Sequence, residues 1–216
     1  MKHGAGLDLK PEYHALARML AGALLHDHPG LRTRRTVIGV AGESGSGKSI
    51  TATCLAHALE ATGLRTAILH QDNYFLRPPR TNHEYRLLDL AHVGPHEVDL
   101  ARIGEHIAAF RAGRDGVTGP AVNYPENRFD TQPLDFGGTD VLLVEGTYVL
   151  TIPDLDVRVF LDATHEDTHE RRKARNRDID APVIRDILAI EHRLIAPQRD
   201  VADYVIDRQF ALSRAR

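Results

Sequence analysis

Residues 37–49 read VIGVAGESGSGKS, an apolar run followed by a turn of small residues, a lysine and a serine. Residues 42–49 match the pattern G-x-x-x-x-G-K-[ST]. Small residues let backbone N–H groups turn toward a phosphate, and the N-terminus of the helix that follows adds partial positive charge. A buried strand, this loop and a helix in direct succession therefore predict a phosphate-binding loop.

The loop supplies the first set of expected ligand contacts. Lys48 would reach the β- and γ-phosphates of a nucleotide, and the Ser49 hydroxyl would bind Mg²⁺. ATP and Mg²⁺ are therefore the expected ligands. The nucleotide is expected to contact the whole loop and the residue after it, namely Gly42, Glu43, Ser44, Gly45, Ser46, Gly47, Lys48, Ser49 and Ile50.

Short apolar strands and amphipathic helices alternate along the chain. Strands are expected at residues 37–41, 66–69, 141–144, 157–161 and 204–206. Helices are expected at residues 7–25, 48–62, 99–112, 165–177 and 183–196. This alternation predicts the α/β class, as a three-layer P-loop NTPase fold with a mainly parallel sheet and helices on both faces.

Acidic residues follow two of the expected strands. Asp72 lies just beyond residues 66–69, and Glu145 lies directly after residues 141–144. Because ligands bind at the carboxyl ends of the strands in an open α/β sheet, both carboxylates would face the nucleotide. Asp72 is then placed to take a proton from a substrate hydroxyl as the general base of a kinase. Glu145 is suited to hold Mg²⁺, directly or through water.

Several further stretches carry a resemblance to a known family. They read GESGSGKS (42–49), HQDNYF (70–75), GPHEVDLARIGEHIAAFRAG (94–113), VNY (122–124), LLVEGTYVL (142–150), VFLDATHEDTHERRKARNRD (159–178) and ADYVID (202–207). In this order they resemble the uridine kinase and phosphoribulokinase family of P-loop small-molecule kinases. The resemblance implies ATP-dependent phosphorylation of a ribonucleoside 5′-hydroxyl, with uridine or cytidine as the first candidates. It also implies a parallel core with a lid, and often a homo-oligomer.

The resemblance implies roles for individual residues. Asp72 would be the general base, and Lys48 would stabilise charge on the transferred group. Arg172, Arg175 and Arg177 would contact phosphates from a lid over residues 165–181, because a transferring phosphoryl group needs cationic partners. The substrate pocket would be lined by Asp72, Tyr74, Phe75, Asn82, His83, Tyr124 and Phe129.

The chain departs from the family pattern at the ribose-binding position. The family usually has Asn-Phe-Asp-His-Pro where this chain has residues 91–95, which read AHVGP. We hypothesise that Asp89 or residues 82–84 (NHE) replace the missing acidic residue. The whole chain, residues 1–216, would form one P-loop kinase domain, with an N-terminal helix and connection over residues 1–35. Residues 76–98 and 114–139 would be irregular segments on the substrate side, with a hairpin near residues 122–124.

The amino-acid composition limits the classes of partner that the chain is expected to bind. The chain has 27 basic and 30 acidic residues, a formal net charge of −3, which gives no general attraction to nucleic acid or an anionic membrane. A single cysteine, Cys54, excludes an internal disulfide framework and a cysteine-rich metal site. No apolar run approaches the roughly 18 residues that a membrane span needs. We expect a cytoplasmic enzyme whose partner is a nucleoside-like small molecule.

Three alternatives stay open. Nicotinamide riboside kinases and other small-metabolite kinases also fit the Gln-Asp pair after the second strand. A catalytically silent nucleotide-binding regulator would keep the loop without transferring phosphate. Residues 165–169 (HEDTH) match the zinc-protease pattern H-E-x-x-H, although the sequence offers no third ligand nearby.

Overall fold

The computed structural model describes residues 10–168 and 182–215. Its main helices are α1 (Pro11–Asp27), α2 (Lys48–Glu60), α3 (Pro79–Leu88), α4 (Leu100–Arg111) and α6 (Pro182–Ile195). Its strands are β1 (Thr36–Gly42), β2 (Thr66–His70), β3 (Val117–Asn123), β4 (Arg128–Leu134), β5 (Val141–Gly146), β6 (Val157–Asp162), β7 (Tyr204–Asp207) and β8 (Leu212–Arg214). Across these described ranges, no helix combines the length and apolar character needed to cross a membrane. Most of the expected lid, including Arg172, Arg175 and Arg177, lies outside them.

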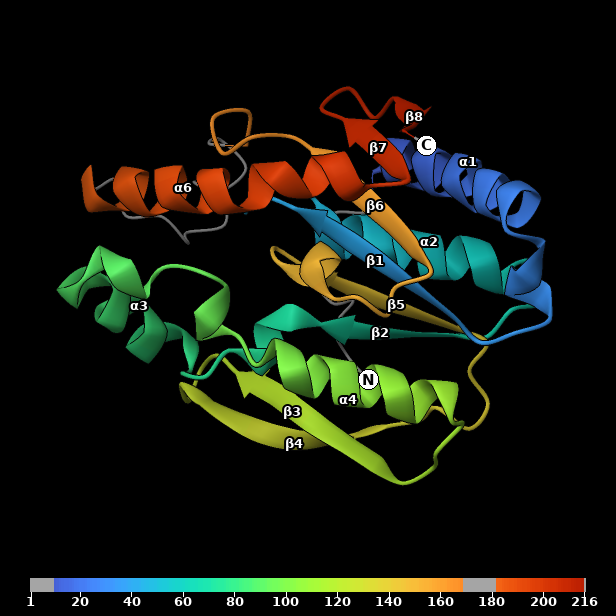
Figure 1. Ribbon diagram of the computed structural model, residues 1–216, viewed down its shortest axis with the longest axis horizontal. Helices are drawn as coiled ribbons and strands as arrows, with labels where there is room; N and C mark the ends of the chain where they lie inside the picture. The colour runs from blue at the N-terminus through green and yellow to red at the C-terminus, as the bar shows by residue number, and fades with distance from the viewer. Residues whose placement is uncertain (1–9, 169–181, 216) are drawn as a thin grey trace.

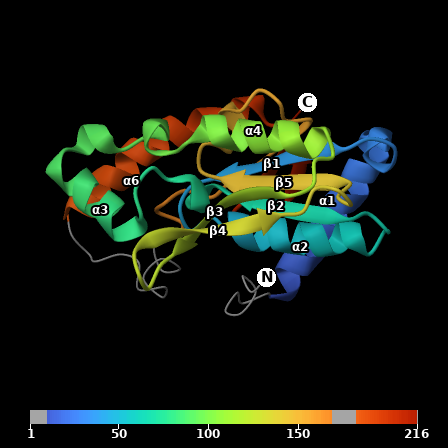
Figure 2. The same cartoon turned by 90° about the horizontal axis from the view of Figure 1, so that it is seen from below.

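A mainly parallel sheet forms the centre of the molecule (Figure 1). Its strand order is β2-β5-β1-β6-β7-β8, and only β8 runs antiparallel to its neighbour. Figure 2 shows α4 on one side of the sheet and α2 on the other. The three-layer P-loop NTPase fold predicted from the sequence is thus confirmed, with β8 as an added edge strand.

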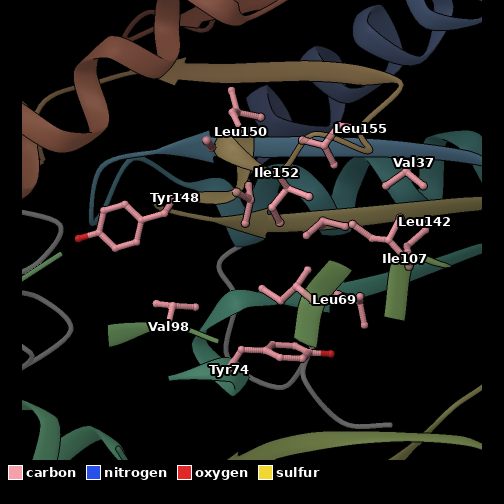
Figure 3. Close-up of a cluster of buried hydrophobic side chains, with 14 of the residues drawn as sticks. Val37, Leu69, Tyr74, Val98, Ile107, Leu142, Tyr148, Leu150, Ile152 and Leu155 are labelled. Atoms are coloured by element: carbon pink, nitrogen blue, oxygen red, sulfur yellow. The ribbon is translucent and has the colours of Figure 1, made fainter. Parts of the chain in front are cut away.

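The central strands are apolar on both faces because both faces are covered. Successive side chains of a strand point to opposite sides. On β1, Val37 and Ala41 join a core with the apolar stripe of α4, whereas Ile38 and Val40 join a core with α1 and α2. Figure 3 shows the first of these cores, in which Val37 and Leu142 of the sheet lie near Ile107 of α4. A continuous apolar run, rather than an alternating one, follows from this double burial.

The two segments expected to be irregular are largely regular. Residues 79–88 form α3, which begins with Pro79 at its first position. Proline is favoured there, because its missing N–H would have no helical partner and its φ angle suits a helix. Residues 117–134 form the hairpin β3–β4, whose turn includes Asn127 at φ 51°. The expectation near residues 122–124 captured only the end of this hairpin.

Burial of β5 gives a test of the fold. Leu143 of β5 is fully buried on the face of the sheet that α2 covers. The variant Leu143→Ala should therefore lower the free energy of unfolding by about 2–5 kcal/mol. The matched variant Leu88→Ala changes a residue that is 80% exposed, so its effect should stay within about 0.5 kcal/mol. Urea unfolding of both variants measures the difference. Equal effects would contradict the burial of β5 on the face that α2 covers.

Candidate active site

The phosphate-binding loop connects β1 to α2 at the carboxyl end of the sheet. Gly45 and Gly47 have φ angles of 80° and 99°, a region that side chains rarely adopt. A Cβ atom on Gly47 would also lie 2.9 Å from the Tyr13 hydroxyl of α1. Both glycines are therefore required for the turn that directs backbone N–H groups and the N-terminus of α2 to one point.

A cavity of about 210 Å³ lies over this loop. That volume suits phosphates and a metal better than a whole nucleotide, since complete ligand sites are about 300–1,000 Å³. Its lining includes six of the nine expected ATP contacts, namely Ser44, Gly45, Gly47, Lys48, Ser49 and Ile50. Gly42, Glu43 and Ser46 are not among the lining residues. The Lys48 ammonium donates to the main-chain oxygen of Glu43 at 3.0 Å.

The predicted Mg²⁺ ligands lie together in this cavity. The Ser49 hydroxyl donates to Glu145 Oε1 at 3.1 Å, and His70 Nδ1 lies 2.7 Å from the same oxygen. Burial opposes ionisation of Glu145, but His70 and then Lys48 outweigh it and hold the pKa of Glu145 below its usual range. An ionised carboxylate beside a hydroxyl is an oxygen donor set that fits Mg²⁺. No sequence pattern indicated His70 as the partner of Glu145.

A second cavity, of about 480 Å³, adjoins the first. The two share Asp72, Phe75 and Arg86 in their linings. Asp72 follows β2 in a short 3₁₀ turn, and the Tyr124 hydroxyl donates to its Oδ2 at 3.4 Å. A carboxylate at the junction of a phosphate cavity and a larger cavity can reach a group held in either one.

Most of the expected substrate residues gather in the larger cavity. Its lining comprises Asp72, Phe75, Arg77, Pro79, Arg80, Asn82, His83, Arg86 and Tyr124. Phe129 faces Val122 across the hairpin and does not line the cavity. Glu84 is exposed outside it, and Asp89 instead accepts from the Ala91 N–H at 2.9 Å. Of the residues hypothesised to replace the missing acid, only Asn82 and His83 line the cavity.

Tyr74 was expected in the pocket but belongs to the core. It is 3% exposed and packs among the apolar side chains of Figure 3. Its hydroxyl lies 2.7 Å from His106 Nδ1 of α4. The 3₁₀ turn after β2 directs Asp72 toward the cavities and Tyr74 into the core, a rotation that the sequence spacing alone does not specify.

Arg86 is the main site residue that sequence reasoning missed. It donates from Nε and Nη2 to the two oxygens of Glu97 at 2.6 and 2.9 Å, and its Nη2 lies 3.1 Å from Glu191 of α6. Glu97, which is 1% exposed, also accepts from Asn82 at 2.7 Å. Burial opposes the guanidinium charge, but Glu97 and Glu191 outweigh it and raise the pKa of Arg86. A predicted helix over residues 79–88 could have identified Arg86 as a residue of the site.

The described part of the chain contains only residues 165–168 of the H-E-x-x-H pattern. His165 bonds to Glu43 of the phosphate-binding loop, with its main-chain N–H 2.6 Å from Oε2. His169, the second histidine of the pattern, lies outside the described residues. The first histidine of the pattern thus contacts the phosphate-binding loop.

Comparison with known proteins identifies the family. Residues 37–211 match the model of the phosphoribulokinase/uridine kinase family. The chain belongs to this family. Membership in the phosphoribulokinase/uridine kinase family implies a phosphotransferase that acts on a small molecule and uses ATP, typically with Mg²⁺.

Named relatives of the phosphoribulokinase/uridine kinase family differ in their acceptors. A bifunctional alpha-galactosidase/sucrose kinase of Mediterraneibacter gnavus is 32% identical over an alignment of 188 residues. The alignment covers 81% of this chain. The match spans only 20% of that relative's length. A uridine kinase of Staphylococcus haemolyticus is 28% identical over 183 residues, which cover 79% of this chain and 86% of the relative.

Solved structures of kinases share the fold. A possible uridine kinase from Bacillus stearothermophilus gives a TM-score of 0.64 at 17% identity and covers 88% of this chain and 97% of its own. A D-glycerate 3-kinase from Cryptococcus neoformans gives a TM-score of 0.63 at 13% identity. That match covers 92% of this chain and 98% of the D-glycerate 3-kinase chain. At these identities the likeness establishes the fold alone.

The burial of His106 predicts a pH dependence of stability. Burial, then the charge of Arg102, lowers the pKa of His106. The unfolded chain therefore takes up a proton below about pH 6.5 that the folded chain does not, so stability falls as the pH falls from 6.5 through the lowered pKa. His106→Gln removes this titration. The stability of the wild type relative to the variant, measured by urea unfolding, should be greater at pH 8 than at pH 5.

Tyr74→Phe serves as the control for this measurement. It removes the hydrogen bond and should cost about 1 kcal/mol at pH 8, but it leaves the imidazole in place and should keep the acid-dependent loss. If the wild type and His106→Gln lost stability in parallel between pH 8 and pH 5, the assignment to His106 would be wrong.

Proposed function

We propose that the protein transfers the γ-phosphoryl group of ATP to a hydroxyl of a small acceptor bound in the larger cavity. The observation that carries the proposal is the position of Asp72, which lines both the phosphate cavity and the larger one. A kinase needs its general base at the point where the acceptor hydroxyl meets the phosphoryl group. The proposal thus rests on where the two cavities meet as well as on the family.

Asp72 accepts the proton of the acceptor hydroxyl as the oxygen attacks phosphorus. Tyr124 orients this carboxylate through its 3.4 Å hydrogen bond. Lys48 exchanges its contact with the Glu43 main chain for the phosphate oxygens, and Arg86 keeps the carboxylates of Glu97 and Glu191 paired at the junction of the cavities. Arg172, Arg175 and Arg177 remain proposed phosphate contacts of the lid.

Ser49 and Glu145 would hold Mg²⁺, and His70 keeps the Glu145 carboxylate ionised and oriented. When bound, the ion neutralises charge on the phosphates and fixes their geometry. Gly42, Glu43 and Ser46 do not line the phosphate cavity, and a main-chain hydrogen bond from Ser46 to Glu43 closes the loop.

Uridine or cytidine is the first proposed acceptor. The uridine kinase relatives and the motifs HQDNYF and VNY support it, and Phe75 and Tyr124 supply aromatic surfaces in the cavity. A sugar hydroxyl is the second candidate. The relative named a sucrose kinase favours it, as do the hydrogen-bonding side chains of Arg77, Asn82 and His83, which match a polyhydroxylated molecule.

An acceptor panel with an Asp72 variant tests the proposal. ADP release from Mg·ATP should be stimulated by at least one of uridine, cytidine, nicotinamide riboside, sucrose, fructose and glycerate. Asp72→Asn should lower kcat on that acceptor by about 10²–10⁴-fold, because the amide cannot accept the proton. Asp154→Asn, a change at an exposed aspartate away from both cavities, should leave kcat unchanged.

The outcomes of the panel separate the alternatives. Turnover of a pyrimidine nucleoside supports the first acceptor, and turnover of sucrose or fructose supports the second. Undiminished turnover by Asp72→Asn would remove the general-base role. Tight ATP binding with no turnover of any acceptor would contradict the kinase proposal and favour a nucleotide-binding regulator.

A further inference from the structure

We propose that Glu43, His165 and His192 form a binding site for a divalent transition metal of the Zn²⁺ type, which links the phosphate-binding loop to α6. These three side chains take no part in the proposed phosphoryl transfer. The inference therefore stands apart from the identity of the acceptor.

The three residues come from distant segments and meet at one carboxylate. Glu43 belongs to the phosphate-binding loop, His165 follows β6, and His192 lies on α6. His192 Nδ1 lies 2.6 Å from Glu43 Oε1, and His165 Nδ1 lies 3.1 Å from Oε2. The candidate ligand atoms all lie within 4.8 Å of one another. Two imidazoles and one carboxylate thus converge on a single point.

This donor set matches zinc rather than magnesium. Two histidines and a glutamate are a known three-residue zinc ligand set that leaves a fourth position for water or another ligand, whereas Mg²⁺ takes oxygen ligands. Tetrahedral Zn²⁺ with these bond lengths separates neighbouring ligand atoms by about 3.3 Å. The candidate ligand atoms lie within 4.8 Å of one another, so metal binding needs their separations to change by no more than about 1.5 Å. The His192 side chain is 42% exposed, so an ion can enter from solvent.

Electrostatics gives a reason for a cation at this place. The Glu43 side chain is only 7% exposed, and it lies in a loop whose ligand is an anion. A buried carboxylate there is costly unless it is paired, and it opposes the approach of phosphate. The hydrogen bond from the Lys48 ammonium to Glu43 goes to the main-chain oxygen and not to this carboxylate. A divalent ion held with His165 and His192 would supply the neutralising charge.

A metal ion bound by Glu43, His165 and His192 would link segments of the chain that border the phosphate cavity. The Thr168 hydroxyl already donates to the main-chain oxygen of Ser44 at 3.0 Å, so residues 165–168 contact the loop beside the cluster. α6 also carries Glu191, which lines the phosphate cavity and pairs with Arg86. Metal binding would therefore fix α6 relative to the loop on which the phosphates rest.

Cobalt titration of the tag-free, chelator-treated full chain tests the site. In excess Mg²⁺, one equivalent of Co²⁺ should give a saturable visible absorption band, and one equivalent of Zn²⁺ should abolish it. His165→Gln and His192→Gln should each weaken the affinity by about tenfold or more. His57→Gln, which changes an exposed histidine of α2, should leave the titration unchanged.

A ligand exchange distinguishes coordination from a purely structural role. His192→Cys keeps a metal ligand at this position, and bound Co²⁺ should then show an additional thiolate charge-transfer band. Absence of a saturable band in the wild type would overturn the proposal and leave a hydrogen-bonded cluster. A wild-type band that persists unchanged in both glutamine variants would overturn it as well, because the metal would then lie elsewhere. Circular dichroism confirms that each variant is folded.

Discussion

Parallel pairing of β1, β2 and β5 is the constraint on which the candidate site depends. Parallel strands end at the same edge of a sheet, so the residues that follow them are brought together whatever their separation in the chain. The loop after β1, Asp72 after β2 and Glu145 at the end of β5 meet in this way. Pairing requires both faces of these strands to be covered, which the two apolar cores achieve. The chemistry of the site is thus tied to the burial of side chains that never touch a ligand.

The site also has to keep carboxylates near a place meant for phosphates. Each of them has a partner: His70 and Ser49 hold Glu145, Arg86 lies between Glu97 and Glu191, and two histidines hold Glu43. Among the residues that the structure describes, such pairing leaves Lys48 and the N-terminus of α2 to face an incoming phosphate. A cavity lined by several acids can therefore still attract an anion, since the local charge is set by pairs and not by the number of acids.

Local signals predicted the scaffold well, and long-range contacts set the limit. The apolar runs gave β1, β2, β5 and β6, and the loop motif brought Ser49 and Glu145 together as expected. α3 was missed because it has few apolar residues and because Pro78 and Pro79 at its start resemble a loop, and Arg86 was missed with it. Tyr74 was misplaced because a single turn decides between pocket and core. The Glu43 cluster joins residues 122 and 149 positions apart, a distance over which no sequence pattern reports contact.

The location of α3 bears on how such enzymes diverge. α3 provides Asn82, His83 and Arg86 to the larger cavity, yet of its ten residues only Asn82 is buried, so it adds little to either apolar core. Asp72 and the phosphate-binding loop are instead anchored in the sheet. Under the proposed function, changes at His83 alter the acceptor cavity at small cost to folding, whereas Asn82 and Arg86 also bond to the buried Glu97 and are costly to replace. A change of acceptor on a fixed phosphate-transfer core would account for relatives named a sucrose kinase and a uridine kinase.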